Sequence, residues 1–181
     1  MTEADLIGKC QKGNRHAQHV LFETYADRFY RLMLRYVRIQ ADAEDLVMIA
    51  FVKIFRHIGG FVLKDQGGLE AWMRKIMVNE ALMLLRKRHN LSLTESIDTL
   101  DPGHNQAVAL QELEPEDLYK MIIDLPPGYR TVFNLFVVEG YDHAEIGAML
   151  GISENTSRSQ LFKAKQLLKR KIERDGIKYG T

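Results

Sequence analysis

A helix-turn-helix pattern near the C-terminus constrains the fold of this chain more than any other feature. Asp142 can cap a helix whose apolar residues recur at helical spacing and whose small residues leave room for a second helix. Gly151 can then take the left-handed backbone of a tight turn, and Ser153 with Glu154 behind it can cap the next helix. The apolar positions of the first helix are Ile146, Met149 and Leu150, and its small ones are Ala144, Gly147 and Ala148.

The second helix of this pattern, from Glu154 to about Ile172, is typical of a helix that reads DNA. Leu161, Ala164, Leu168 and Ile172 form its inward stripe. Short polar groups near the start of such a helix can reach base edges, and the cations that follow suit phosphates. The predicted contacts to DNA on or beside its open face are Asn155, Thr156, Arg158, Ser159, Phe162, Lys163 and Lys165.

Charge is segregated along a chain whose net charge is only +1. Residues 153–178 hold eight Lys or Arg against three acids, and Glu80 is the only acid in a second basic block between Trp72 and Asn90. Between the two blocks, residues 94–124 carry eight acids against Lys120 alone. Two cationic surfaces separated by an acidic stretch indicate two contacts with one polyanion.

The acidic stretch also marks a boundary between domains. It includes a run from Ser92 to Gln106 that is rich in turn-forming residues and has weak periodicity, which is typical of a linker. Four prolines and no strand-like alternation in 181 residues favour helix throughout. We expect an all-α protein with two small helical domains, 1–91 and 112–181, joined by a flexible acidic linker at 92–111.

The first half is predicted to contain five helices. Thr2 with Asp5 forms a capping box for the first, and Asn14 caps a second through Phe22. A third spans Phe29 to Val37. Asp42 caps a fourth, apolar on more than one face, that ends at Gly59-Gly60, and the fifth runs from about Leu69 to His89. In the fifth helix we expect Trp72, Ile76, Leu82, Met83 and Leu85 to be buried.

Several classes of function are excluded by what the sequence lacks. One cysteine, Cys10, cannot form an internal disulfide, and six scattered histidines have no metal-site spacing. No phosphate-binding glycine loop, nucleophile with a plausible base, or pair of carboxylates in an apolar setting occurs. Without a signal-peptide core or a bilayer-length apolar stretch, we expect a cytoplasmic protein that is not an enzyme, needs no cofactor or metal and does not insert into a membrane.

Three stretches in order resemble the bacterial RNA polymerase sigma factors of the extracytoplasmic-function group. They are residues 42–47 (Asp-Ala-Glu-Asp-Leu-Val) with 51–55, residues 69–82 around Trp72 and Asn79, and residues 125–133 (Leu-Pro-Pro-Gly-Tyr-Arg-Thr-Val-Phe) through Lys169. The resemblance implies a first domain that binds the polymerase clamp and the -10 promoter element, and a second that binds the -35 element. It also admits an anti-sigma factor as an inhibitory partner.

Contacts to the -10 element follow from the middle stretch together with its chemistry. Asn79 is a poor helix former on a helix rich in apolar residues, and its amide can read an unpaired base. The family holds a flipped base in the loop from Phe61 to Gln66, where stacking, charge and amide groups are available. The predicted -10 contacts are Phe61, Lys64, Gln66, Arg74, Lys75, Asn79, Arg86, Lys87 and Arg88.

Contacts to the polymerase core are expected at the start of the fourth helix. Carboxylates there can meet basic clamp residues, although capping and compensation of the helix dipole would explain them as well. One departure from the family stands beside them. Met48-Ile49-Ala50 replaces a usual Gln and acid, so either the contact is more apolar or a neighbouring segment covers these side chains. The predicted core contacts are Asp42, Glu44, Asp45, Val47, Met48 and Phe51.

Two other functions compete with a sigma factor. A helix-turn-helix repressor or response-regulator output domain would act without polymerase core, but it does not explain the second basic block around Asn79. A small helical enzyme or adaptor would use the hairpin only for protein contact, and it leaves the segregated charge unexplained.

Overall fold

The computed structural model describes residues 2–63, 68–89 and 115–174, and the chain divides into two units, Met1–Arg88 and His89–Thr181. Regular structure in the described residues is helical throughout, as the sequence predicts. The predicted linker at 92–111 lies outside the described residues. No helix in these parts of the chain combines the length and the apolar character that crossing a bilayer requires.

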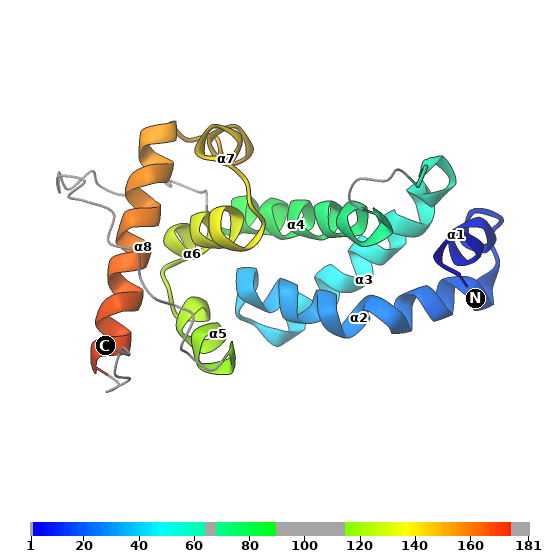
Figure 1. The fold of residues 1–181 in the computed structure, drawn as a ribbon, viewed down its shortest axis with the longest axis horizontal. Helices are drawn as coiled ribbons and strands as arrows, with labels where there is room; N and C mark the ends of the chain where they lie inside the picture. The colour runs from blue at the N-terminus through cyan, green and yellow to red at the C-terminus, as the bar shows by residue number, and fades with distance from the viewer. Residues whose placement is uncertain (1, 64–67, 90–114, 175–181) are drawn as a thin grey trace. The chain divides into compact units, whose positions relative to one another are not determined.

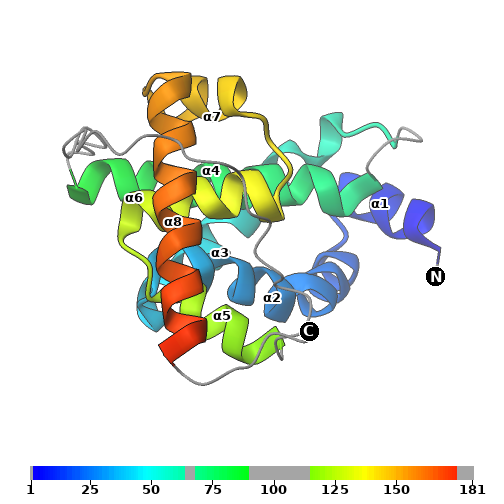
Figure 2. The ribbon, with the colours of Figure 1, turned by 60° about the vertical axis from the view of Figure 1, so that its left-hand side comes forward.

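The first unit is built on two long antiparallel helices that lie side by side in Figures 1 and 2. Thr2 and Asp5 form the predicted capping box at its start, and the side chain of Asn14 accepts a hydrogen bond from the Ala17 N–H at 2.9 Å. Its elements are α1 (Glu3–Gln11), α2 (Arg15–Val37), α3 (Gln40–His57), the short 3₁₀ helix η1 (Ile58–Gly60) and α4 (Gly68–His89).

Ion pairs tie α4 to the other long helices of this unit. Lys53 on α3 contacts the largely buried carboxylate of Glu80 at 2.7 Å, and Arg28 on α2 pairs with Glu70. Near its end, Arg88 makes a two-pronged contact with Asp42, in which Nη2 donates to Oδ1 at 2.7 Å. The apolar side chains between the helices include Phe29, Met33, Tyr36, Phe51, Ile54, Met73 and Met77.

Two predicted helix boundaries are wrong. The second and third predicted helices are one helix, α2, because nothing between Phe22 and Phe29 breaks a helix. Asp42 is not the cap of α3, which begins at Gln40 after Ile39 with no side-chain cap. The Asp42 carboxylate lies instead in the first turn of the helix, where it binds Arg88.

The predicted burial of α3 and α4 is also partly wrong. Only one face of α3 is covered in the described residues, since Met48, Ile49 and Val52 are 57%, 47% and 56% exposed. On α4, Leu82 and Leu85 are buried as expected, whereas Met83 is 54% exposed. Trp72 and Ile76 are half-buried. Both α3 and α4 therefore present apolar side chains to solvent.

The second unit consists of shorter helices set along one long helix, α8, as Figures 1 and 2 show. Buried Arg130 links the first two, because its Nη1 donates to the carbonyls of Ile123 and Leu125 at 2.8 and 3.0 Å. The predicted inward stripe of α8 is confirmed: Leu161, Ala164, Leu168 and Ile172 are buried. The elements are α5 (Pro115–Ile123), α6 (Pro127–Phe133), the π-helical turn η3 (Asn134–Val138), α7 (His143–Leu150) and α8 (Glu154–Arg174).

Candidate nucleic-acid interface

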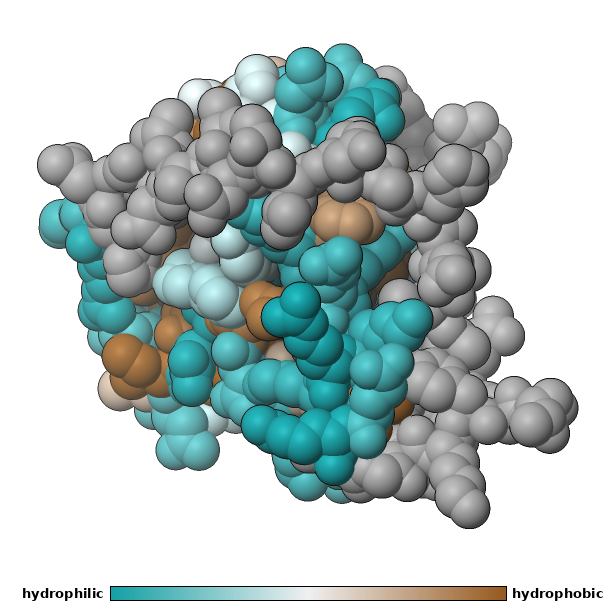
Figure 3. Space-filling model, turned by 90° about the vertical axis from the view of Figure 1, so that its left-hand side faces the viewer, coloured by the Kyte–Doolittle hydropathy of each residue, from teal (hydrophilic) through white to brown (hydrophobic). Residues whose placement is uncertain are grey.

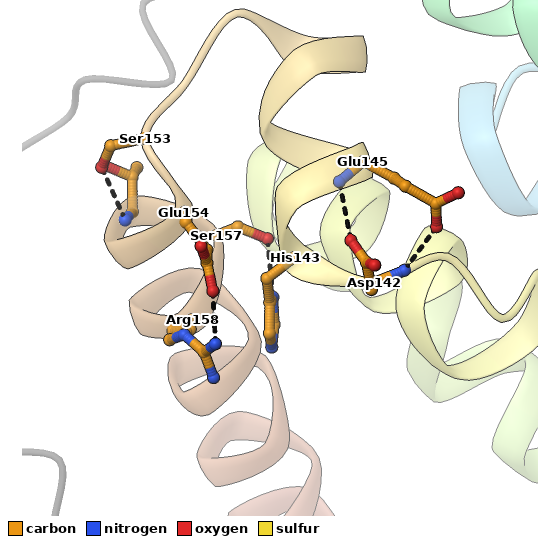
Figure 4. A network of polar contacts seen from close by, with 8 residues as sticks. Asp142, His143, Glu145, Ser153, Glu154, Ser157 and Arg158 are labelled. Atoms are coloured by element: carbon orange, nitrogen blue, oxygen red, sulfur yellow. Dashed lines mark hydrogen bonds and ion pairs between the residues drawn. The ribbon is translucent and has the colours of Figure 1, made fainter.

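The helix-turn-helix forms as its sequence predicts, and Figure 4 shows its polar contacts. The Asp142 carboxylate accepts from the Glu145 N–H at 2.8 Å, while the Glu145 carboxylate accepts from the Asp142 N–H at 2.9 Å. Gly151 ends α7 in the left-handed region, with φ of 69°. Ser153 Oγ then accepts from the Thr156 N–H at 3.0 Å and thereby caps α8. These local contacts end α7 and begin α8 at the residues that the sequence predicts.

The predicted -35 contacts fall mostly on one open face of α8. Asn155, Arg158 and Ser159 are exposed near its start, and Phe162, Lys163 and Lys165 are half-buried one to two turns later. Thr156 differs, because its hydroxyl lies 2.8 Å from that of Ser153 and belongs to the cap. In the view onto the α8 side of the molecule, hydrophilic residues cover much of the surface that is not grey (Figure 3). Polar side chains of this kind can contact base edges, and the cationic side chains that follow them can bind phosphates.

Arg158 pairs with Glu154 one turn earlier on the same helix. Both side chains are largely exposed, so the pair contributes little to stability and can open when a better partner arrives. A guanidinium that is held over the start of the helix is placed where a recognition helix meets bases.

A buried polar contact joins the two helices behind this face. Nδ1 of His143, the first residue of α7, lies 2.9 Å from Oγ of Ser157 on α8. The imidazole stacks on Phe136 of η3, with ring centroids 4.4 Å apart and planes at 21°. Burial first, and then the guanidinium of Arg158, lowers the pKa of His143 below its ordinary value. The neutral imidazole is therefore favoured at neutral pH.

A second polar and cationic face lies on α4 in the first unit. Lys75, Asn79, Arg86 and Lys87 are exposed, and Met83 is exposed one turn after Asn79. Arg74 is half-buried, and Arg88 is exposed but bound to Asp42. Because Glu80 faces Lys53, the acid within this basic block is neutralised away from the open face. The structure thus brings most of the predicted -10 residues of α4 to one surface.

The loop before α4 is held at its first residues. The Phe61 ring packs on Trp72 with centroids 4.9 Å apart, and the Gln11 amide donates to the Phe61 carbonyl at 2.8 Å. Trp72 is therefore half-buried against the loop rather than in the core. Lys64 and Gln66, also predicted to contact the -10 element, lie outside the described residues.

The predicted polymerase contacts separate into two groups. Glu44, Asp45 and Met48 lie on the exposed face of α3, whereas Asp42 is mostly covered by its contact with Arg88. Val47 and Phe51 are 4% and 2% exposed, so in this structure they belong to the core of the first unit and cannot be reached by a partner. Ile49 and Val52, which the prediction left out, complete an outer face that is acidic at its start and apolar in its middle.

Sequence reasoning missed His143 and Ser157, although the pattern holds a signal for Ser157. Ser157 precedes Leu161 by four residues and so continues the inward stripe of α8. A hydroxyl on an apolar stripe needs a buried partner, and only the fold shows that His143 supplies it.

Comparison with known families and sequences agrees with this geometry. Sigma-70 region 2 matches residues 21–91, and sigma-70 region 4 matches residues 115–168. The ECF RNA polymerase sigma factor SigE of Mycolicibacterium smegmatis is 34% identical over 155 residues, which are 82% of this chain and 59% of that protein. The ECF RNA polymerase sigma-E factor of Haemophilus influenzae is 27% identical over 96% of each chain.

Two solved structures share the fold. CnrH in complex with the cytosolic domain of CnrY is 19% identical, covers 94% of this chain and 96% of its own, and has a TM-score of 0.51. The sigma factor RpoE of Bartonella quintana in complex with the anti-sigma factor NepR is 20% identical, covers 87% and 97%, and has a TM-score of 0.52. Both units of this chain thus have counterparts in known helical proteins.

Proposed function

Because this chain belongs to the ECF sigma factors of the sigma-70 family, we propose that it binds RNA polymerase core and directs initiation at promoters that it reads at two elements. The observation that carries this proposal is the open face of α8, where the capped turn from Gly151 to Ser153 presents Asn155, Arg158 and Ser159 to solvent. This face enters the major groove of the -35 element. Lys163 and Lys165 then lie toward the phosphates.

The face of α4 binds the -10 element. Lys75, Arg86 and Lys87 attract the backbone whether the strands are paired or separate. Asn79 lies among them with its amide exposed, and it contributes only when a base has left the helix and offers its pairing edge. The contact between the Phe61 and Trp72 rings holds the start of the neighbouring loop for the same strand.

The outer face of α3 binds the polymerase clamp. Glu44 and Asp45 supply exposed carboxylates for basic partners, and Met48, Ile49 and Val52 supply an apolar surface beside them. Large apolar side chains that gather on one exposed helix face are typical of a protein interface. This geometry favours the first of the two explanations for Met48-Ile49-Ala50, a contact that is more apolar than usual in the family.

An anti-sigma factor that covers one of these faces would keep the protein inactive. In solved structures that share this fold, CnrH is bound to the cytosolic domain of CnrY, and the sigma factor RpoE is bound to the anti-sigma factor NepR. The protein itself carries out no chemistry in this proposal, since polymerase forms the bonds of the RNA.

The competing function is a helix-turn-helix regulator that works without core. Mapping of transcription starts after overexpression yields candidate promoters, and run-off transcription with purified core then tests them. A sigma factor gives transcripts only when chain and core are both present. Transcripts from core with its usual sigma factor that this chain merely raises or lowers would support the regulator instead.

A further inference from the structure

His143 has a buried polar side chain that takes no part in the proposed contacts with DNA and polymerase. It joins three elements, because it begins α7, stacks on Phe136 of η3 and shares a hydrogen bond of 2.9 Å with Ser157 of α8 (Figure 4). His143 is 9% exposed and Ser157 is fully buried, so neither side chain can touch DNA directly.

One residue of this hydrogen bond lies beside the cap of α7, and the other lies among the predicted base contacts of α8. His143 follows the Asp142 cap directly, so the capping box with Glu145 holds its backbone at a fixed point. Ser157 lies immediately before Arg158 and two residues from Asn155 and from Ser159, in the turn of α8 that carries the predicted base contacts. A hydrogen bond at Ser157 therefore constrains the rotation of α8 about its own axis in the turn that carries these residues.

The rotation of α8 about its axis decides which side chains face DNA, because successive helix residues point about 100° apart, with roughly 3.6 residues per turn. A modest rotation of α8 redirects Asn155, Arg158 and Ser159 together. Leu161 and Ala164 of α8 pack against the rest of the unit, but apolar packing is not directional. A hydrogen bond has a preferred angle and length, so it can fix what packing alone leaves loose.

An apolar pair of the same shape would serve stability about as well as this polar pair, since matched replacement of both partners of a buried hydrogen bond is often nearly neutral. The hydrogen bond therefore contributes its direction and length more than net stability. Charged groups surround the imidazole as well: Arg158 and Lys165 disfavour its protonation, whereas Glu154 and Asp142 favour it.

We propose that His143 is a positioning residue for reading the -35 element, which acts through Ser157 to set the rotation of α8 and thus the direction of Arg158. This inference rests on the proposed sigma-factor function. Without the hydrogen bond, α8 still reaches the DNA backbone, but its polar tips no longer meet base edges together. Specific recognition weakens while phosphate binding persists.

Three substitutions separate the hydrogen bond from the ring. Ser157→Ala removes the hydroxyl with little change of volume, and His143→Phe keeps a ring on Phe136 but loses the bond. His143→Asn places an amide group where Nδ1 was, so it keeps a bond to Ser157 but loses the ring. The measurement is the affinity of holoenzyme, reconstituted from full chain and polymerase core, for a mapped promoter duplex and for the same duplex with only its -35 element scrambled.

We expect Ser157→Ala and His143→Phe each to weaken binding to the intact promoter by about 3- to 10-fold, the scale of one hydrogen bond. Binding to the scrambled duplex should stay unchanged. His143→Asn should retain most of the preference, and Ser157→Ala with His143→Phe should lose no more than either alone.

The proposal is overturned if Ser157→Ala and His143→Phe leave the preference intact, or if they weaken both duplexes equally while lowering the unfolding temperature. A loss in His143→Asn as large as in His143→Phe also overturns it, since the bond would then not be the cause. Failure of the sigma-factor function itself gives a different result, namely wild-type holoenzyme that binds both duplexes alike.

Discussion

The Cα of Gly147 lies so close to the carbonyl oxygen of Ile152 that a Cβ on residue 147 would be 2.8 Å from that oxygen. The Gly147 carbonyl in turn accepts hydrogen bonds from the N–H groups of Gly151 at 2.9 Å and Ile152 at 3.1 Å. The turn between α7 and α8 is therefore closed around this glycine. A larger residue must push the backbone of the turn away.

Gly147→Ala should accordingly destabilise the second unit by about 1 to 3 kcal/mol, the usual cost of forcing extra atoms into a packed site. Thermal unfolding followed by circular dichroism measures this change. Gly8→Ala is the matched control, because Gly8 is also helical but has nothing within 4 Å of its Cβ position. The control should be neutral or slightly stabilising, and equal unfolding temperatures for Gly147→Ala and wild type would contradict the close approach.

Arg158→Ala should cost about 1 to 3 kcal/mol of specific binding to the -35 element if its guanidinium reads a base. Opening the exposed pair with Glu154 offsets little of this. Lys169→Ala, on the exposed C-terminal half of α8, should instead lower the salt slope by about one and affect all duplexes similarly. Affinities of holoenzyme across a salt series distinguish the two. Equal losses on specific and random duplexes for Arg158→Ala would rule out base reading there.

Asn79→Ala should spare the closed complex yet reduce strand opening. The Asn79 side chain is exposed, so its removal leaves the core intact and deletes only the amide. Lys75→Ala, from the same face, should weaken both stages because phosphates are present in both. Permanganate reactivity of thymines near the -10 region, on a linear promoter and on one with a pre-melted bubble, is the measurement. Normal melting of both templates by Asn79→Ala would show that Asn79 takes no part in strand opening.

Acid should destabilise the second unit through His143. Burial and Arg158 lower its pKa in the folded state, so the unfolded chain binds more protons once the pH falls below about 6.5. The stability that the neutral His143 contributes is fully present above that pH and is lost as the pH falls further. Between pH 7.5 and pH 5.5, the unfolding temperature of His143→Phe should therefore fall less than that of wild type. Parallel losses in the two proteins would show that another group is responsible.

The sequence predicts local features of this fold well and long-range ones poorly. Caps at Asn14, Asp142 and Ser153 were predictable because a cap bonds residues within three positions of itself. Asp42 was assigned wrongly as a cap because its partner, Arg88, is 46 residues away. The hydrogen bond between His143 and Ser157 depends in the same way on how two helices meet.

Burial shows the same limit on the long helices. Met83 was expected to be buried because of its hydrophobicity, and only the packing of α4 reveals that it is exposed, whereas Met48 was predicted as a contact for a partner and is exposed. Val47 and Phe51 were assigned to a partner surface and are buried in the protein's own core. Hydrophobicity predicts that a residue will be covered, but it does not tell whether the same chain or another one covers it.

The most direct measurement is promoter binding by this chain with and without polymerase core, using wild type, Met48→Asp and Met83→Asp. Met48 and Met83 are similarly exposed, on α3 and on α4, so the two substitutions are matched. We predict that specific binding by wild type requires core, that Met48→Asp loses it by losing core affinity, and that Met83→Asp keeps core affinity. Specific, tight binding by the chain alone, with core adding nothing, would contradict the sigma-factor function.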